Sequence, residues 1–302
     1  MSAAAPQSIN ADSSKPASPI EPQKQDGAEV LVEVVESHLG NSPFYRLPEV
    51  YDRLRAPYPA MQRAASAAIA RWLDGACHRV LDPACGPGNW LWPFAQQGLH
   101  VAGNDLVAEM IDYARRRFAS LPGSHEFVVG DMCDLQLQSG PFDVALDIAG
   151  TCNHLPDDEH LIRHFRSVAA HLRPGGVFLV SIFLDNGASL DLPQELYERP
   201  FTPLEQGEAS IRYDLLARWP GFERIRRTIS LRGGPEGNRQ LAEEYDSRVF
   251  TSAEITACID RSACFDLCAW IELPDEDADD GSFLVLDPSV EYGVITLVLR
   301  RR

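Results

Sequence analysis

The sequence predicts an α/β fold: a mostly parallel sheet with helices on both faces, and an antiparallel β segment inserted toward its C-terminal end. Two observations predict it. From residue 78 to residue 183, short apolar segments rich in Val, Leu and Phe alternate with amphipathic segments of helical period, the order that builds βαβ units. Residues 208–250 hold three segments of alternating polarity separated by Gly-rich turns, the pattern of an antiparallel meander.

The N-terminal region divides into a tail and a helical part. Residues 1–28 are rich in Ser, Ala, Pro and Gln, a composition typical of disorder. Residues 29–78 are expected to form a helical flap, because apolar residues recur at helical spacing over 28–40 and again over 59–74. The aromatic segment between these two helices is interpreted either as two short packed helices or as a flap over a ligand.

The remaining residues, 79–302, are expected to form one domain with an antiparallel lid inserted at about 185–250. Thr251 and Glu254 have the spacing of a capping box and predict a helix over 251–262. The other expected elements are strands at 78–83, 100–105, 125–131, 142–150, 175–183, 265–273 and 292–301, and helices at 89–98, 107–120 and 160–172.

Composition and charge exclude several classes of function. The net charge of −17 argues against a nucleic-acid partner and against an anionic membrane, since both need a basic surface. The only lysines, Lys15 and Lys24, lie in the tail, so neither Schiff-base chemistry nor a Walker-type phosphate loop is expected in the folded part. No apolar run reaches the ~18 residues of a membrane span, and seven cysteines without paired spacing fit a reducing compartment. We therefore expect a soluble, cytoplasmic protein.

The segment VLDPACGPGNW, residues 80–90, places a glycine turn directly after a strand. Gly86 and Gly88 let backbone amides approach a ligand closely, because a Cβ would block the approach. Asp82 ends that strand, Asp105 ends the next one, and Asp131 follows the third. Parallel strands present their carboxyl ends at one edge, so the three carboxylates should converge there. Such a site favours a cationic, hydroxyl-rich ligand over a pyrophosphate.

These segments resemble, over roughly residues 79–184, the class I S-adenosylmethionine-dependent methyltransferases. The resemblance implies a Rossmann-like, mostly parallel seven-stranded sheet and S-adenosyl-L-methionine as cofactor. It implies that Gly86 and Gly88 meet the methionine part and that Asp105 accepts hydrogen bonds from the ribose. Ala84 replaces the first glycine of the family's turn, which is acceptable if this residue needs no positive φ. The other positions assigned to the cofactor, at its amino end and around its adenine, are Asp82, Leu106, Asp131, Met132, Ile148 and Ala149.

The residues after the fourth strand narrow the substrate class. Residues 149–155, AGTCNHL, lack the segments of enzymes that methylate bases, glutamine or protein arginine. With its inserted lid the chain resembles small-molecule methyltransferases, so we expect a small-molecule partner, and the oligomeric state stays open. Two alternatives remain: an NAD- or nucleotide-sugar-binding oxidoreductase, against which Leu91 replaces the third glycine of a dinucleotide turn, and an S-adenosylmethionine-binding protein without catalysis.

Methyl transfer requires few catalytic groups from the protein. Methyl transfer is an in-line displacement, so alignment and exclusion of water supply most of the acceleration. If the acceptor must lose a proton, His154 is the best-placed general base, because histidine titrates near neutral pH; a loop histidine bonded to backbone is the equally acceptable alternative. Tyr51 is the second catalytic candidate, with Tyr45, Asn153 and Cys152 behind it.

Two further patterns have competing interpretations. His160 and His164 stand four residues apart on one helix and resemble a metal-binding pair, but no third ligand is fixed by spacing and we expect no metal. The meander carries eight arginines that either pair with Glu243, Glu244 and Asp246 on the solvent face or hold an anion of the substrate. They are Arg212, Arg218, Arg224, Arg226, Arg227, Arg232, Arg239 and Arg248.

Overall fold

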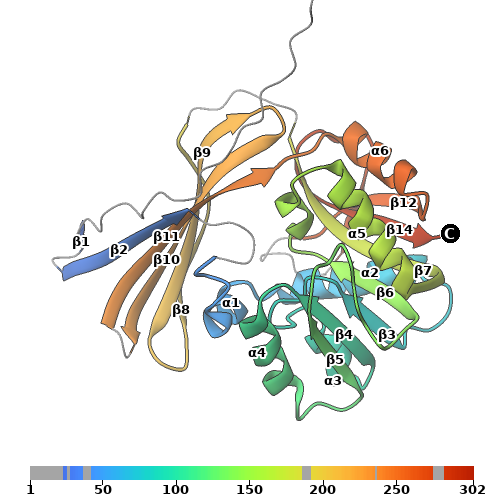
Figure 1. The fold of residues 1–302 in the computed structure, drawn as a ribbon, viewed down its shortest axis with the longest axis horizontal. Helices are drawn as coiled ribbons and strands as arrows, with labels where there is room; N and C mark the ends of the chain where they lie inside the picture. The colour runs from blue at the N-terminus through green and yellow to red at the C-terminus, as the bar shows by residue number, and fades with distance from the viewer. Residues whose placement is uncertain (1–22, 26–27, 37–41, 186–191, 235–236, 275–281) are drawn as a thin grey trace, which may run out of the picture.

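The protein consists of a helix-covered β-sheet and a second, twisted sheet beside it (Figure 1). The computed structural model describes residues 23–25, 28–36, 42–185, 192–234, 237–274 and 282–302, the first two ranges as backbone only. No helix in these ranges combines the length and the apolar character required to cross a membrane.

The larger sheet has the mostly parallel order predicted from the sequence. Eight strands follow the order β13-β12-β14-β7-β6-β3-β4-β5, with the last five parallel and the first three antiparallel to their neighbours. The predicted seven strands are confirmed, and the short β13 extends one edge. Their bounds are β3 Arg79–Asp82, β4 His100–Asp105, β5 His125–Val129, β6 Phe142–Asp147, β7 Leu172–Leu184, β12 Phe265–Glu272, β13 Leu284–Leu286 and β14 Gly293–Arg301.

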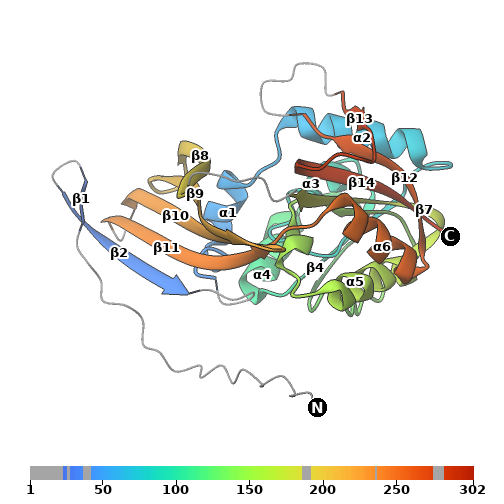
Figure 2. The ribbon, with the colours of Figure 1, turned by 90° about the horizontal axis from the view of Figure 1, so that it is seen from above.

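Helices cover both faces of this sheet, each over its own apolar cluster. On one face α2 (Pro59–Trp72), α3 (Trp92–Gln96) and α4 (Ala108–Phe118) bury Ile69, Ala95 and Phe118. On the other, α5 (Asp158–His171) and α6 (Ser252–Ser262) bury Phe165 and Ile259 (Figure 2). Adjacent β3 residues belong to opposite clusters, as the period of two in a strand requires. The predicted capping box of α6 is present.

The second sheet, called the lid below, has the order β1-β2-β11-β10-β9-β8. Strands β9 (Glu208–Trp219), β10 (Phe222–Gly234) and β11 (Gly237–Arg248) form the predicted meander, and β8 (Gln194–Pro203) pairs with β9. The lid leaves the parallel sheet after β7 and returns before α6, where Leu184 and Phe250 form a β-bridge.

The helix predicted at residues 28–40 is wrong over Ala28–Glu36, which form strand β2. β2 pairs in parallel with β11, from Leu31 opposite Arg239 to Glu36 opposite Glu244. Four of its nine residues are valines, whose branched Cβ favours an extended backbone over a helix once a partner strand is available. Residues 23–25 form β1, so the predicted tail ends earlier than residue 28 and Lys24 belongs to a strand. Residues 1–22 and 37–41 lie outside the described part.

Helix α1, Pro48–Leu54, packs on the lid. Leu54 and Phe44 share an apolar cluster with Ile211 and Ile229 of the lid, and the Phe44 ring centroid lies 5.0 Å from that of Tyr51. The aromatic segment therefore packs on the lid as a turn and one helix, not as the two short helices of the first interpretation, and the second interpretation, a flap over a ligand, stays open. It also bridges the lid and the parallel sheet.

Candidate functional site

Four carboxylates gather at the carboxyl edge of the parallel sheet. Asp82, Asp105 and Asp147 end β3, β4 and β6, and Asp131 follows β5. Asp82 and Asp147 are buried, at 3% and 2% exposure, Asp105 is partly buried and Asp131 is exposed. Asp147 is an acid that the sequence analysis missed, although it occupies the same strand-end position as the others.

The glycine turn after β3 is tied to the end of β4. The Gly86 amide donates to Asp105 Oδ2 over 2.8 Å, the Val107 amide donates to Oδ1 over 2.9 Å, and the Ala84 amide donates to Asp82. Gly86 and Gly88 have φ of +51° and +83°, and a Cβ at Gly88 would lie 2.6 Å from the Phe118 ring. Ala84 has no positive φ, so the condition for its replacing glycine is met. Helix α3 has five residues, so the turn's backbone rather than a long helix faces the edge.

The loops that flank this turn are held in one arrangement. The Asn104 side chain donates to the carbonyls of Pro83 (3.0 Å) and Gly130 (2.9 Å), joining the loops after β3 and β5. Asp131 caps its own loop by accepting from the Cys133 amide. Of the apolar positions predicted to contact the cofactor, Leu106 is 47% exposed and Ala149 is exposed, whereas Met132 and Ile148 are buried. The structure brings all the predicted cofactor positions to this edge of the sheet.

The edge carries excess negative charge. Burial raises the pKa of Asp82 well above its usual range, and the nearby Asp147 carboxylate raises it further. Burial also raises the pKa of Asp105, against the lowering effect of its backbone hydrogen bonds. A cation bound among these carboxylates would offset the repulsion between them.

Tyr51 of α1 lies over the glycine turn. A Cβ at Gly86 would lie 3.5 Å from Tyr51 Cε1. The next residue, Asp52, accepts from Arg117 (2.9 Å) and Tyr113 (3.0 Å) of α4, which fixes α1 against the parallel sheet. Burial raises the pKa of the Tyr51 hydroxyl, so Tyr51 stays a hydrogen-bond donor and is unsuited to act as a base.

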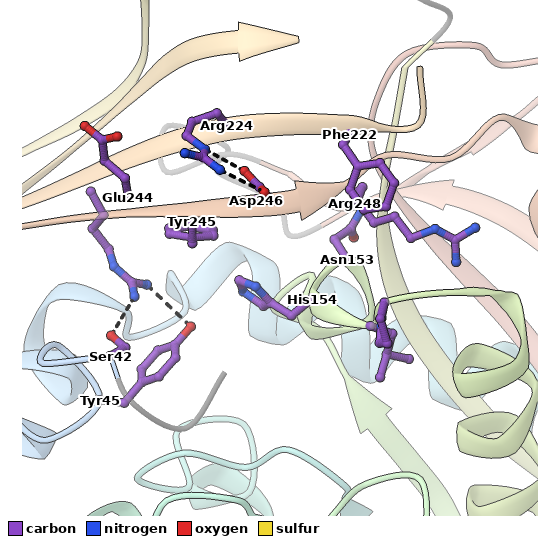
Figure 3. Close-up of a pocket in the computed structure, with 13 residues that line it drawn as sticks. Ser42, Tyr45, Asn153, His154, Phe222, Arg224, Glu244, Tyr245, Asp246 and Arg248 are labelled. Carbon is purple, nitrogen blue, oxygen red and sulfur yellow. Dashed lines mark hydrogen bonds and ion pairs between the residues drawn. The ribbon is translucent and has the colours of Figure 1, made fainter. Parts of the chain in front are cut away.

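A cavity of about 520 Å³ lies between the lid and the loop after β6 (Figure 3). His154 ends the 3₁₀ turn η1 (Thr151–His154) and lines this cavity, with its ring centroid 5.3 Å from that of Tyr245 on β11. Burial, then the positive charge of Arg227, lowers the pKa of His154 to about 4. The imidazole is therefore neutral at physiological pH and can accept a proton or a hydrogen bond.

Two weaker catalytic candidates have structural partners instead. The Asn153 amide donates to the carbonyls of Phe183 and Arg248 and accepts from the Phe183 amide, so it ties η1 to β7 and β11. The Cys152 thiol donates to Asp147 Oδ2 over 3.2 Å, and burial raises its pKa well above the usual range. A neutral thiol that donates a hydrogen bond is no nucleophile.

The predicted histidine pair is separated in the structure. His160 bonds to Asp157 on the surface, whereas His164 is buried with Nε2 3.4 Å from Asp147 Oδ2. Asp147, Cys152 and His164 place one possible ligand atom each within 4.8 Å of the others, a group that could hold a metal ion. In this structure the same atoms contact one another instead: Cys152 Sγ donates to Asp147 Oδ2, and His164 Nε2 lies beside that oxygen.

The lid arginines form ion pairs, as the first of their two interpretations predicted. Arg224 pairs with Asp246, Arg226 with Glu244 and Arg227 with Glu243. The last pair is buried, not on the solvent face as predicted: Arg227 and Glu243 are 3% and 1% exposed. Arg212, Arg218 and Arg248 also pair with carboxylates, and Arg232 lies 3.7 Å from the Phe201 ring centroid.

Residues 80–176 match the family model described as "Methyltransferase domain". Among curated proteins, a dTDP-4-amino-2,3,4,6-tetradeoxy-D-glucose N,N-dimethyltransferase from Saccharopolyspora spinosa is 36% identical over 101 residues, 33% of this chain and 39% of that protein. Glycine N-methyltransferase from Rattus norvegicus is 29% identical over 136 residues, 39% of this chain and 46% of that protein. The chain thus aligns with about half or less of the length of these relatives.

The fold extends beyond that matched segment. A crystal structure of an S-adenosylmethionine-dependent methyltransferase from Clostridium acetobutylicum superposes with a TM-score of 0.63 at 17% identity, covering 86% of this chain and 99% of the other. Residues 80–176 therefore form a methyltransferase domain, and the described chain shares its Rossmann-like fold with that S-adenosylmethionine-dependent methyltransferase. The predicted class is confirmed, and the oxidoreductase alternative has no support among these matches.

Proposed function

We propose that this protein transfers the methyl group of S-adenosyl-L-methionine to an amine nitrogen of a small molecule. The observation that carries the proposal is that Tyr51 covers the carboxylate-lined glycine turn and packs against Tyr45, which lines the cavity that also holds the neutral His154. Both relatives named above are named as methyltransferases that act on nitrogen, one on an amino sugar and one on glycine. The proposed acceptor is not a nucleic acid.

The residues at the sheet edge fit the cofactor. Gly86 and Gly88 both have a positive φ, which favours glycine, and without a Cβ at either residue the turn can approach the methionine part closely. Asp105 keeps lone pairs for the ribose hydroxyls beside its two backbone donors. The sulfonium and ammonium charges would meet the raised-pKa carboxylates of Asp82 and Asp105. The adenine would contact Leu106, Asp131 and Met132, and the backbone at Ile148 and Ala149 would face the amino group.

The protein's contribution to catalysis is positioning and exclusion of water. The cofactor supplies an electrophilic methyl group; the nitrogen lone pair forms the new C–N bond while the C–S bond breaks and its electron pair stays on sulfur as S-adenosylhomocysteine. We assign the neutral His154 imidazole as the group that accepts the proton released by the nitrogen. Tyr51, held over Gly86 by the Asp52–Arg117 pair, excludes water from the turn.

We also propose a cytoplasmic location. All seven cysteines lie within the described residues and are free thiols, which suits a reducing compartment.

The experiment has two parts. Calorimetric titration with S-adenosylhomocysteine tests the site, and absence of binding would refute the proposal. Incubation with radiolabelled S-adenosylmethionine and a panel of amino sugars and amino acids tests transfer. Labelled product with release of S-adenosylhomocysteine supports an enzyme, whereas binding without transfer to any extract component supports a catalytically inactive binding protein.

A further inference from the structure

Arg55 lies between the glycine turn and the lid. It caps the C-terminus of α1, and its amide donates to the Tyr51 carbonyl over 2.8 Å, so it stands one turn beyond the tyrosine that covers Gly86. Its partly buried guanidinium carbon lies 5.8 Å from the centroid of the Tyr213 ring on β9. Arg55 thus reaches from the helix that covers the turn to the lid.

Arg55 differs from Arg224, Arg226 and Arg227 of the lid in having no acidic partner within the described residues. Arg227 lies 5.9 Å from the centroid of the same Tyr213 ring, but it pairs with the buried Glu243 and with Ser42. Within the described ranges, no carboxylate and no other hydrogen-bond acceptor lies within bonding distance of the Arg55 side chain. A cation withdrawn from water without a counter-charge is costly, and an anion placed beside it would recover that cost.

The charge of Arg55 acts on both halves of the candidate site. It lowers the pKa of the Tyr51 hydroxyl against the larger effect of burial, and it contributes to the lowered pKa of His154. The acids at the sheet edge, Asp82 and Asp105, repel an anion. The anionic part of a ligand bound across this site must therefore lie away from that edge, toward α1 and the lid.

We propose that Arg55 binds an anionic group of a ligand, a carboxylate or a phosphate, at the junction of the cofactor turn and the lid. The planar guanidinium offers two parallel donors that match either group. The anion has two possible sources: the carboxylate of the cofactor's methionine part, or an anionic group of the acceptor. The inference rests on the proposed function for the identity of the cofactor. Arg224, Arg226 and Arg227 of the lid are already paired with carboxylates, whereas Arg55 is not.

The first arm of the test addresses the cofactor. Arg55→Gln is compared with Arg53→Gln, an equal change of charge at an exposed position of α1. Affinities for S-adenosylhomocysteine and for its decarboxylated analogue are measured by calorimetry. If the cofactor carboxylate is the ligand, the wild type and Arg53→Gln prefer the carboxylated form by about tenfold or more, the usual effect of a charge-assisted pair. Arg55→Gln loses that preference while binding the decarboxylated analogue as the wild type does.

The second arm addresses the acceptor. Inorganic phosphate and acetate are titrated into each protein saturated with S-adenosylhomocysteine. If the acceptor supplies the anion, one of these probes binds the wild type and Arg53→Gln but not Arg55→Gln, and the cofactor preference is equal in all three proteins. Thermal unfolding verifies that each variant is folded, and Arg55→Lys, which keeps the charge but not the bidentate geometry, replaces Arg55→Gln if the latter does not fold.

The inference is overturned if the wild type and Arg55→Gln have equal ligand affinities in both arms. This holds even if Arg55→Gln has a lower melting temperature than the wild type. That result would mean that Arg55 merely complements the C-terminus of α1. Failure of the wild type to bind S-adenosylhomocysteine is a different result: it refutes the proposed function, and the phosphate and acetate titrations of the free protein then still decide whether Arg55 binds an anion.

Discussion

The carboxyl edge of the parallel sheet and the lid beside it hold their charges in different ways. At the edge, the buried Asp82 and the partly buried Asp105 accept hydrogen bonds from backbone amides, and no arginine of the described residues forms an ion pair with either. In the lid, Arg224, Arg226 and Arg227 each face a carboxylate on the neighbouring strand. The carboxylates of the edge are therefore available to bind a cationic ligand, whereas these three lid arginines are already paired with carboxylates.

This difference assigns separate tasks to the two regions. In the proposed function the edge contributes electrostatic binding free energy, because a bound cation would relieve repulsion among its carboxylates. In the proposed function the lid contributes shape and exclusion of water, and we expect its ion pairs to act on stability rather than on ligand affinity. Charge-changing variants at the edge should therefore alter ligand affinity, whereas charge-changing variants in the lid should alter the free energy of unfolding.

The largest expected effect is on lid stability. Glu243→Gln leaves Arg227 buried without its carboxylate and should lower the free energy of unfolding by about 3–5 kcal/mol. Glu244→Gln is the matched control, because Glu244 is the next residue of β11 and pairs with the more exposed Arg226; it should cost less than about 1 kcal/mol. Urea unfolding measures both, and equal losses would contradict the distinction between buried and exposed pairs.

The next effect concerns the backbone of the cofactor turn. Gly88→Ala forces alanine to φ +83° and pushes its Cβ against Phe118, so the free energy of unfolding should fall by about 3 kcal/mol. Gly75→Ala has nearly the same φ, +87°, but no heavy atom within 4 Å, and should cost about 1 kcal/mol. The comparison isolates close packing from strain. A loss at Gly88 no larger than at Gly75 would show that Phe118 moves aside freely.

The third effect tests the edge directly. Asp105→Ala removes a charged acceptor of ribose hydroxyls and should weaken S-adenosylhomocysteine binding by about 2 kcal/mol. Asp112→Ala, at an exposed acid on α4, should leave the affinity within twofold of wild type by calorimetry. If Asp105→Ala bound S-adenosylhomocysteine as the wild type does, Asp105 would not accept hydrogen bonds from the ribose. The proposed electrostatic contribution of the edge to binding would then also be wrong.

The same two regions differ in how far the sequence predicts them. Local sequence patterns predict the strands from β3 to β7, because the apolar residues of each strand show its period within a few residues. They also predict the positions of Asp82, Asp105 and Asp131, because each follows directly after an apolar segment. Asp147 had the same signal and was overlooked. The lid depends on pairing between distant segments: β2 was taken for a helix because its apolar residues also fit a period of 3.6, and only β11, about 200 residues later, supplies the partner that decides it.

β8 gives no signal at all, because most of its residues are exposed and Pro200 lies within it. The pairing state of each arginine was equally beyond prediction. Arg227 and Arg55 approach the same tyrosine ring, yet only the fold shows that one has a carboxylate beside it and the other has none. Charge counted along the sequence says how many arginines there are, not which of them remains available to a ligand.

The smallest expected effect tests whether the cavity beneath the lid keeps His154 neutral. The pKa of His154 is lowered from 6.5 to about 4 in the folded protein, so between these values the unfolded chain binds a proton that the native protein does not. The stability that the neutral imidazole contributes is therefore present above about pH 6.5 and is lost progressively as the pH falls toward 4. His154→Asn removes this titration and leaves the other ionisable groups in place.

The wild type should accordingly lose about 0.7 kcal/mol more than His154→Asn on going from pH 7 to pH 6, measured by urea unfolding of both proteins in the same buffers. Direct titration of the His154 ring by NMR should give a midpoint near 4. A midpoint near 6.5, with equal pH dependence of the two proteins, would mean that water enters the cavity freely. The proposed role of the lid would then be wrong, because the lid would not exclude water from the cavity that contains His154.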